Sequence, residues 1–397
     1  MEKTDVSKLT SMELVHLMKT GWNLGNTLDA HWNEKPVKEM KTTEDQETFW
    51  GNPVTTKAMI EWLKKSGVNT IRVPVTWYMF TEDGPDYKIA EAWMNRVQEV
   101  VDYVIDSGLF CVLNIHHDDY QKGPDWEIGW FRLYHCDGFL RKPSSEGRPL
   151  DSGTKEMIQT RFKKLWEQIA ARFKDYDNYL VFEGINEPRT VGFEVPYNQT
   201  WEEQSGFLNT LLQIFVDTVR ASGGGNKMRH LMVSPFFASV GMDPEDREGR
   251  IRYFVDRENK KLRINDPSNR MIASLHYYEP WGFVSAPRTS EYFSETFDLS
   301  KAVVSGNISN VLRIIKENFI DYDIPVVMGE TGAGRRDNIE GHDKERVKWA
   351  RHYIAKLKEL GVPSIIWDDG GHFRLFDRRN LGWFYPELAA AFIEASK

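Results

Sequence analysis

Two glutamates follow short apolar runs that have the composition of buried strands. The first run, residues 179–182, leads into Asn186 and Glu187 just before a proline ends further strand pairing. The second run, residues 325–328, leads through a glycine into Glu330. In a barrel of parallel strands, both acids would lie at the carboxyl ends of strands, on the face where such enzymes keep their chemistry. Two carboxylates across one pocket suit glycoside hydrolysis, in which one protonates the leaving oxygen and the other attacks or activates water.

A single glutamate is most often a solvated loop residue, so the case depends on the neighbouring residues. Arg72 lies within the strand-like run 69–74, where a buried charge is costly unless it is paired, and Glu330 is its natural partner. A nearby cation lowers the pKa of a carboxylate, so we expect Glu330 to be the ionised, nucleophilic group. Glu187 is then expected to be the acid, with its pKa raised by the charge of Glu330. The alternative for Arg72 is a purely structural ion pair.

Polar residues also follow two other strand-like runs. His116 and His117 come directly after one of them. Adjacent histidines beside acids occur in zinc and two-metal hydrolases, but the sequence offers no further ligands with matching spacing. Hydrogen bonding to a sugar or to the catalytic carboxylates is therefore favoured over metal catalysis. After a later run, His276 and Tyr278 are two residues apart, which places them on the same side of an extended segment. The tyrosine hydroxyl could then reach the nucleophile.

The chain is rich in tryptophan, with 14 in 397 residues. Tryptophan in polar, glycine-rich loops suggests platforms for the flat apolar faces of sugar rings. Trp367, at the end of the last strand-like run, is expected to stack under the sugar that is cleaved, with a capping core position as the alternative. The residues expected to bind substrate along an open cleft are Asn26, Trp32, Trp77, His117, Trp126, Trp130, Trp281 and Trp367.

Eight strand-like runs, with helix-like apolar stripes between most of them, position these residues. The runs lie within residues 21–32 and at residues 69–74, 109–115, 179–182, 230–234, 271–275, 326–328 and 364–367. Repetition of strand then helix implies a parallel sheet, and eight units imply closure. We therefore predict the α/β class and a single-domain (β/α)8 TIM barrel over residues 1–397. Loop insertions are expected at about residues 120–153 and 240–267, the second with little barrel structure, and residues 1–18 are expected to close the bottom or side of the fold.

Composition restricts the partners of the chain. The net charge is −8 with both signs interspersed, which argues against nucleic acid and anionic membranes as partners and favours a neutral substrate. Neither of the two cysteines belongs to a metal-spaced pair, so disulfides are not expected to hold the fold. The N-terminus lacks the apolar core of a signal peptide. Because a polysaccharide cannot enter a cell, we nevertheless expect a secreted, periplasmic or cell-surface protein whose leader is absent from this sequence. We also expect a monomer.

With these residues assembled, the chain resembles glycoside hydrolase family 5, the cellulase family. The motifs that carry the resemblance are GWNLGNTLDA, NTIRVPVTW, LNIHHDD, FEGINEPR, HYYEPW, VVMGETGA and IIWDDG, in this order between residues 21 and 392. The resemblance implies a (β/α)8 barrel, no cofactor and no catalytic metal, with Glu187 as acid/base and Glu330 as nucleophile. It also implies a supporting set at the site, made up of Arg72, His116, Asn186, His276, Tyr278 and Trp367.

The segment GNTLDA and the loop containing FWGNP look most like the endoglucanase subgroup that includes xyloglucan- and mixed-linkage-glucan-cleaving enzymes. Thr331 departs from the family, in which many members place an aromatic residue after the nucleophile. The sequence thus predicts a retaining endo-β-1,4-glucanase that works through a covalent glycosyl-enzyme. The alternatives are a β-mannanase, glucomannanase or xylanase on the same scaffold, a metal-dependent barrel hydrolase using the two adjacent histidines, and a catalytically silent sugar-binding barrel.

Overall fold

The computed structural model describes residues 5–31, 42–82, 84–118, 152–188, 201–239, 241 and 244–397, together with residues 134–135 and 148–149. Most of the expected insertion at residues 120–153 therefore lies outside the described residues. Within the described ranges, no helix is both long enough and apolar enough to span a bilayer.

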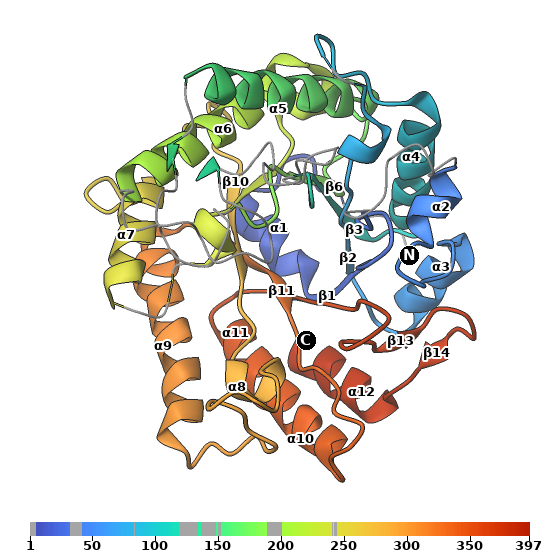
Figure 1. Cartoon of the computed structure of the whole chain (residues 1–397), viewed down its shortest axis with the longest axis vertical. Helices are drawn as coiled ribbons and strands as arrows, with labels where there is room; N and C mark the ends of the chain where they lie inside the picture. The colour runs from blue at the N-terminus through green and yellow to red at the C-terminus, as the bar shows by residue number, and fades with distance from the viewer. Residues whose placement is uncertain are drawn as a thin grey trace.

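Eight parallel strands close into a barrel in the order β1-β12-β11-β10-β7-β6-β3-β2. Figure 1 looks into this barrel, with the strands in the centre and the helices around them. The strands are β1 (Thr20–Asn23), β2 (Thr70–Val73), β3 (Phe110–Asn114), β6 (Leu180–Glu183), β7 (Leu231–Val233), β10 (Met271–His276), β11 (Val326–Thr331) and β12 (Ser364–Ile366). Strands that follow each other along the chain are neighbours in the barrel, as repeated strand-helix units require. The predicted α/β class and (β/α)8 barrel are confirmed.

A ring of helices covers the outside of the barrel (Figure 1). These helices are α3 (Lys57–Lys65), α4 (Glu91–Asp106), α5 (Ser152–Arg172), α6 (Trp201–Ala221), α7 (Pro244–Phe254), α9 (Ala302–Asn318), α10 (His342–Trp349), α11 (Ala355–Glu359) and α12 (Pro386–Ala395). A π-helical segment, Ala350–Ile354, joins α10 to α11. The expectation of little barrel structure at residues 240–267 was wrong, because α7 packs beside α6 and connects β7 to β10.

Shorter elements decorate this frame. They are the helices α1 (Ser11–Met18), α2 (Thr43–Glu47) and α8 (Trp281–Val284), the 3₁₀ turns Tyr78–Phe80, Gly224–Lys227, Phe236–Ala238 and Ile320–Tyr322, and three two-stranded pairs. The pairs join β4 (Tyr134–His135) to β5 (Arg148–Pro149), β8 (Val255–Asp256) to β9 (Lys261–Leu262) and β13 (Phe376–Asp377) to β14 (Gly382–Trp383).

Local chemistry sets several helix ends. The Thr10 side chain accepts a hydrogen bond from the Glu13 amide, and the Glu13 carboxylate accepts one from the Thr10 amide, which makes a capping box for α1. Gly67 and Gly108 follow the ends of α3 and α4 with φ of 104° and 70°, a conformation that residues with a β-carbon rarely adopt. These stops return the chain to the barrel bottom, where the next strand begins.

Helix α1 closes the lower end of the barrel, as predicted for residues 1–18. Its buried residues Leu14, Val15 and Met18 form one cluster with inward-facing strand residues such as Val112 and Val181. The barrel interior is thus filled by side chains at this end, as is usual for the fold.

Inward-facing positions change from apolar to polar toward the carboxyl ends of the strands. On β6, Val181 belongs to the apolar cluster at the bottom, and the next inward position is Glu183. On β3, Val112 is followed in the same way by Asn114, which lies opposite Glu183 in the strand register. Because side chains alternate along a strand, a polar layer stacks directly above the apolar one.

Candidate active site

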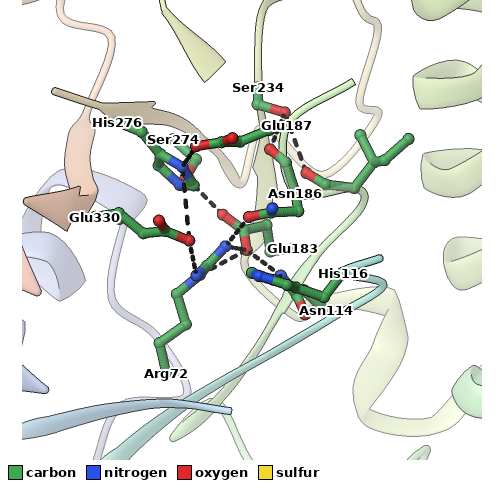
Figure 2. A network of polar contacts seen from close by, with 12 residues as sticks. Arg72, Asn114, His116, Glu183, Asn186, Glu187, Ser234, Ser274, His276 and Glu330 are labelled. Carbon is green, nitrogen blue, oxygen red and sulfur yellow. Dashed lines mark hydrogen bonds and ion pairs between the residues drawn. The ribbon is translucent and has the colours of Figure 1, made fainter. Parts of the chain in front are cut away.

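Arg72 is the centre of this polar layer (Figure 2). Its side chain, from β2, is fully buried, and its Nη1 donates to Glu330 Oε1 at 2.8 Å. Its Nε donates to Glu183 Oε2 at 2.8 Å, and its Nη2 donates to Asn186 Oδ1 at 2.7 Å. Burial alone would lower the pKa of Arg72, but the two carboxylates outweigh that effect and raise it, so the guanidinium stays charged. The predicted pairing with Glu330 is present, together with a second carboxylate that the sequence analysis did not anticipate.

That second carboxylate, Glu183, is completely buried at the end of β6. Its Oε1 accepts a hydrogen bond from Ser274 Oγ at 2.6 Å, and its Oε2 accepts one from Asn114 Nδ2 at 2.9 Å. Oε2 also lies 2.7 Å from Arg72 Nη2, so two edges of the guanidinium face this group. Side-chain alternation along the run 179–183 is the sequence signal that could have identified Glu183 as an inward-facing acid.

Asn23, at the end of β1, also went unassigned in the sequence analysis. Its Nδ2 donates to the carbonyls of Gly329 at 3.0 Å and Ile365 at 3.2 Å, which ties β1 to β11 and β12. Its Oδ1 accepts from Arg72 Nη1 at 3.0 Å. Asn23 therefore links the strand that carries Glu330 to the orientation of the guanidinium.

Glu330 lies in β11 and is held by donors on both oxygens. Arg72 binds Oε1, and the Tyr278 hydroxyl donates to Oε2 at 3.0 Å, which places the tyrosine where the sequence predicted. Burial raises the pKa of Glu330, whereas His276, Arg72 and the Tyr278 hydrogen bond each offset part of that increase. The expectation that Arg72 would lower this pKa below its usual value was wrong, because removing the carboxylate from water has the larger effect.

Glu187 and Asn186 follow β6 in a segment with several backbone anchors. The amide of Asn186 donates to the Ile115 carbonyl at 3.0 Å, and Ser234 Oγ donates to the Ile185 carbonyl at 3.1 Å. The side chain of Glu187 is 23% exposed, compared with 7% for Glu330, so Glu187 faces the opening of the site. One ligand atom each from Glu187, His276 and Glu330 lie within 4.8 Å of one another. The structure thus brings together the two acids that the sequence paired.

His276, from β10, lies between the two acids. Its Nδ1 is 2.9 Å from Glu187 Oε1 and 3.7 Å from Glu330 Oε1. Burial would lower the pKa of His276, but the neighbouring carboxylates outweigh it and raise the pKa. Burial and the same acids raise the pKa of Tyr278 far above its ordinary value, so its hydroxyl keeps the proton that it donates.

His116 lies beside Arg72 as a neutral imidazole. Burial and the cationic neighbours hold the pKa of His116 well below its usual value. Asn114 Oδ1 accepts from the Val75 amide at 3.1 Å, so its Nδ2 must be the group that faces His116 Nδ1 at 3.1 Å. His116 Nδ1 is therefore an acceptor, and Nε2 carries the proton.

This tautomer bears on the metal alternative. Ligand atoms of Asp29, His116 and His117 lie within 4.8 Å of one another. However, Nε2 of His116 has no lone pair to give in this arrangement, and Nδ1 is already bonded to Asn114. The Asp29 carboxylate accepts the backbone amides of residues 26 and 27 at 3.0 and 2.6 Å, which fixes its loop. The donors fit a loop anchor and hydrogen bonding better than they fit a cation.

The predicted aromatic platforms have different outcomes. The ring of Trp367 is partly exposed and lies parallel to His116, with 5.8 Å between centroids and 2° between planes. The prediction for Trp77 was wrong, because its side chain is fully buried and its indole donates to the Asn114 carbonyl at 3.0 Å. Trp281 is 42% exposed at the start of α8 and contacts the ring of Tyr292 edge to face. Three predicted platforms, Trp32, Trp126 and Trp130, lie outside the described residues.

The two other predicted binding residues lie on loops at the same end of the barrel. His117 is partly exposed, and its ring contacts those of His31, Trp50 and His116. Asn26 is partly exposed with φ of 54°, and its carbonyl accepts from Asn52 Nδ2 at 2.8 Å. Both residues have polar groups near the site, although neither contacts the acids directly in the bonds described above.

Comparison with known proteins agrees with this geometry. The family described as cellulase (glycosyl hydrolase family 5) matches residues 29–372. Endoglucanase B of Clostridium cellulovorans is 34% identical over 403 residues, covering 99% of this chain and 78% of that protein. A structure of a broad specificity endoglucanase from Ruminococcus champanellensis with bound cellotriose superposes with a TM-score of 0.79 at 35% identity, covering 99% of this chain and 100% of that one. A lichenase from Caldicellulosiruptor sp. F32 with cellotetraose gives a TM-score of 0.81 at 30% identity, covering 100% and 98%.

Proposed function

This chain belongs to glycosyl hydrolase family 5, the cellulase family, and on that basis we propose that it is a retaining endo-β-1,4-glucanase. The substrate is a β-glucan polysaccharide or oligosaccharide, and the reaction passes through a covalent glycosyl-enzyme. No metal or cofactor takes part in this scheme.

The separation of the two acids carries the proposal. Oxygens of Glu187 and Glu330 lie within 4.8 Å of each other. Retaining enzymes hold their carboxyl groups about 5–5.5 Å apart, whereas inverting enzymes need roughly 6.5–9.5 Å to admit a water between acid and sugar. The shorter separation favours direct attack by one carboxylate on the anomeric carbon.

Burial and hydrogen bonding assign the two roles. Glu330 accepts from Arg72 and Tyr278, and these donors stabilise the ionised form that a nucleophile needs. Glu187 is the more exposed acid and accepts from His276, so it can reach both the leaving oxygen and solvent. We assign Glu330 as nucleophile and Glu187 as acid/base.

The reaction then has two steps. Glu330 attacks the anomeric carbon while Glu187 gives its proton to the glycosidic oxygen, so that the C–O bond breaks and the first product leaves. Glu187 next takes a proton from water, the water attacks the anomeric carbon, and the ester to Glu330 breaks. Each step inverts the anomeric centre, so the β configuration is retained overall.

The choice of polysaccharide belongs to the proposal. The binding of cellotriose and cellotetraose by two similar structures supports a β-1,4-linked glucan backbone as ligand. A panel of cellulose, mixed-linkage glucan, xyloglucan, glucomannan and xylan tests this, with release of reducing ends as the readout. Rapid internal cleavage of the glucans is expected. Cleavage of mannan or xylan alone would instead support the β-mannanase or xylanase alternative on the same scaffold.

Stereochemistry and metal dependence separate the remaining alternatives. Proton NMR of fresh hydrolysate should show the β-anomer first, and activity should survive a chelator. Activity that a chelator abolishes and zinc restores would favour the metal-dependent hydrolase. Purified protein that leaves every polymer and reporter glycoside intact would favour a sugar-binding barrel.

We further propose that the protein acts outside the cytoplasm as a monomer. The size of a polysaccharide, which cannot enter a cell, supports the first part. Glucanase activity in the culture medium or at the cell surface, and light scattering of the purified protein, test the two parts separately.

A further inference from the structure

A third carboxylate lies directly behind the two acids of the reaction. Figure 2 shows Glu183 on one side of the Arg72 guanidinium and Glu330 on the other. Both side chains of the Arg72–Glu183 pair are completely buried. Glu183 does not touch Glu187 or Glu330 in any hydrogen bond of the described residues, so the reaction scheme above gives it no task.

The contacts of Glu183 determine how Arg72 is presented. Arg72 Nε and Nη2 lie 2.8 and 2.7 Å from the same oxygen of Glu183, which fixes the plane of the guanidinium. The opposite edge of that plane then reaches Glu330 Oε1 at 2.8 Å and Asn186 Oδ1 at 2.7 Å. A long arginine side chain without this second contact has several rotamers available, and most of them do not reach both partners.

Glu183 is itself held in place from two neighbouring elements. Ser274 Oγ, on β10, donates to its Oε1 at 2.6 Å, and Asn114 Nδ2, on β3, donates to its Oε2 at 2.9 Å. Asn114 also contacts His116, so the same carboxylate is connected to the histidine at the rim. These contacts make Glu183 a rigid support inside the barrel.

We propose that Glu183 is a positioning residue for the hydrolysis: it clamps Arg72 so that one edge of the guanidinium serves Glu330 and Asn186, and its negative charge balances Arg72 inside the barrel. This inference rests on the proposed function. It assigns Glu183 no contact with the sugar.

Charge balance gives the inference a measurable consequence. Arg72 shares its positive charge between Glu183 and Glu330, and the two carboxylates repel each other across it. Without the charge of Glu183, Arg72 would stabilise ionised Glu330 more strongly. The other titratable groups that face Arg72 and Glu330 are Glu187 after β6, His276 on β10, Tyr278 after β10 and His116 after β3.

The variant Glu183→Gln removes the charge and can keep the contacts. Its amide oxygen can accept from Arg72 and Asn114, while its NH2 group can donate to Ser274 Oγ. We expect the acidic limb of the kcat/KM profile to move to lower pH by about one unit, since a freed cation lowers the pKa of Glu330. We also expect kcat at the optimum to fall about tenfold, because a better stabilised carboxylate is a weaker nucleophile. KM should change much less.

Two further variants separate charge from contact. Ser274→Ala removes a hydrogen bond to Glu183 but keeps its charge, so the acidic limb should stay at the wild-type pH. Glu183→Asp keeps the charge but shortens the side chain, so the acidic limb should stay while kcat falls. Thermal unfolding of each variant identifies the temperature range in which the folded enzyme can be assayed.

Several results would overturn the inference. They are an acidic limb that stays in place or moves upward in Glu183→Gln, and an equal downward shift in Ser274→Ala. Should Glu183→Gln fail to fold, wild-type kcat in Glu183→Asp would be enough to reject the clamp. The wild type reports on the proposed function separately, because a wild type that cleaves no polysaccharide contradicts the function, and an active one leaves the variants to test Glu183.

Discussion

Arg72 and Tyr278 approach the same carboxylate from different sides, and both favour its ionised form. Arg72 binds one oxygen of Glu330 and Tyr278 binds the other, so the anion has donors on both oxygens although it is buried. Burial opposes this stabilisation and raises the pKa of Glu330. The activity should therefore be lost as pH falls through a value above that of an ordinary glutamate.

At this scale the two acids can be tested by chemical rescue. Glu187→Ala and Glu330→Ala should each lower kcat by several orders of magnitude, because each removes one partner of the double displacement. Azide should restore turnover in both, giving the β-glycosyl azide with Glu187→Ala and the α-glycosyl azide with Glu330→Ala. Product NMR reads the configuration. Glu61→Gln, an exposed position on α3, is the control for changing a glutamate. Near-normal turnover in either alanine variant would refute the assignment.

Removing the Tyr278 hydroxyl tests the electrostatics of Glu330. Tyr278→Phe deletes the 3.0 Å hydrogen bond that favours the ionised carboxylate, so the pKa of Glu330 should rise further. The acidic limb of kcat/KM is expected to move to higher pH by about half a unit to one unit. Tyr322→Phe, which precedes β11 at the other end of the barrel, is the control. An acidic limb that stays in place in Tyr278→Phe would mean that this hydroxyl does not stabilise the anion.

At the scale of elements, β11 passes close to β10 where both deliver site residues. A β-carbon on Gly329 would lie 2.8 Å from Ser274 Oγ and 2.9 Å from His276 Nε2. The two strands also shift register here, between Leu275 and His276. Glycine therefore allows β11 to place Glu330 beside His276.

Gly329→Ala should disturb this approach. We expect a loss of about 1–3 kcal/mol in unfolding free energy from overpacking, together with a lower kcat because His276 is displaced. Gly306→Ala on α9 is the matched control, because nothing lies within 4 Å of its new β-carbon. That variant should be neutral or stabilised by up to about 1 kcal/mol. Denaturant unfolding and kcat measure both effects, and a Gly329→Ala enzyme with wild-type values would contradict the account of β11.

The elements also show what sequence patterns could and could not reveal. Parallel strands buried on both faces read as continuous apolar runs, so the barrel was predictable. Helix α7 was missed because Ile251 and Phe254 are its buried apolar side chains in the described part, too few for a helical stripe. Trp77 was assigned to the cleft because its local sequence does not show Asp118, whose carboxylate accepts the Trp77 amide at 2.8 Å from another loop.

The site residues divide in the same way. Glu187, Glu330 and Tyr278 were recognisable because each follows an apolar run at one end of the barrel. Asn23 and Glu183 lie one layer deeper, where the function of a polar residue depends on strands that are distant in sequence. Their partners become visible only when the barrel closes.

At the scale of the whole molecule, the barrel has a polar, reactive upper end and a closed lower end. Helix α1 is attached to the lower end partly through His230, whose Nδ1 lies 2.9 Å from Ser11 Oγ. Arg270 Nη1 donates to His230 Nε2 at 3.3 Å, so this nitrogen is an acceptor and Nδ1 carries the proton. Burial and the surrounding arginines lower the pKa of His230 from 6.5 to about 3.

His230 should make the fold sensitive to acid. Between pH 6.5 and about 3, the unfolded chain binds a proton on this residue that the folded chain does not, so stability falls as pH falls. His230→Gln can keep hydrogen bonds to Ser11 and Arg270 without titrating. Its unfolding free energy should depend less steeply on pH, by roughly 1.4 kcal/mol per unit between pH 6 and 4.5. Parallel pH curves from urea unfolding of the two proteins would rule out this role.

The central claim is that a sugar becomes covalently bound to Glu330 during each turnover. A 2-deoxy-2-fluoro cello-oligosaccharide with a good leaving group slows the second step, so the intermediate accumulates and can be located by proteolysis and mass spectrometry. The account predicts one added glycosyl group, on the peptide that contains Glu330, and none in Glu330→Gln. An adduct on another residue would contradict it, as would an enzyme that turns over this compound in the first step without any adduct.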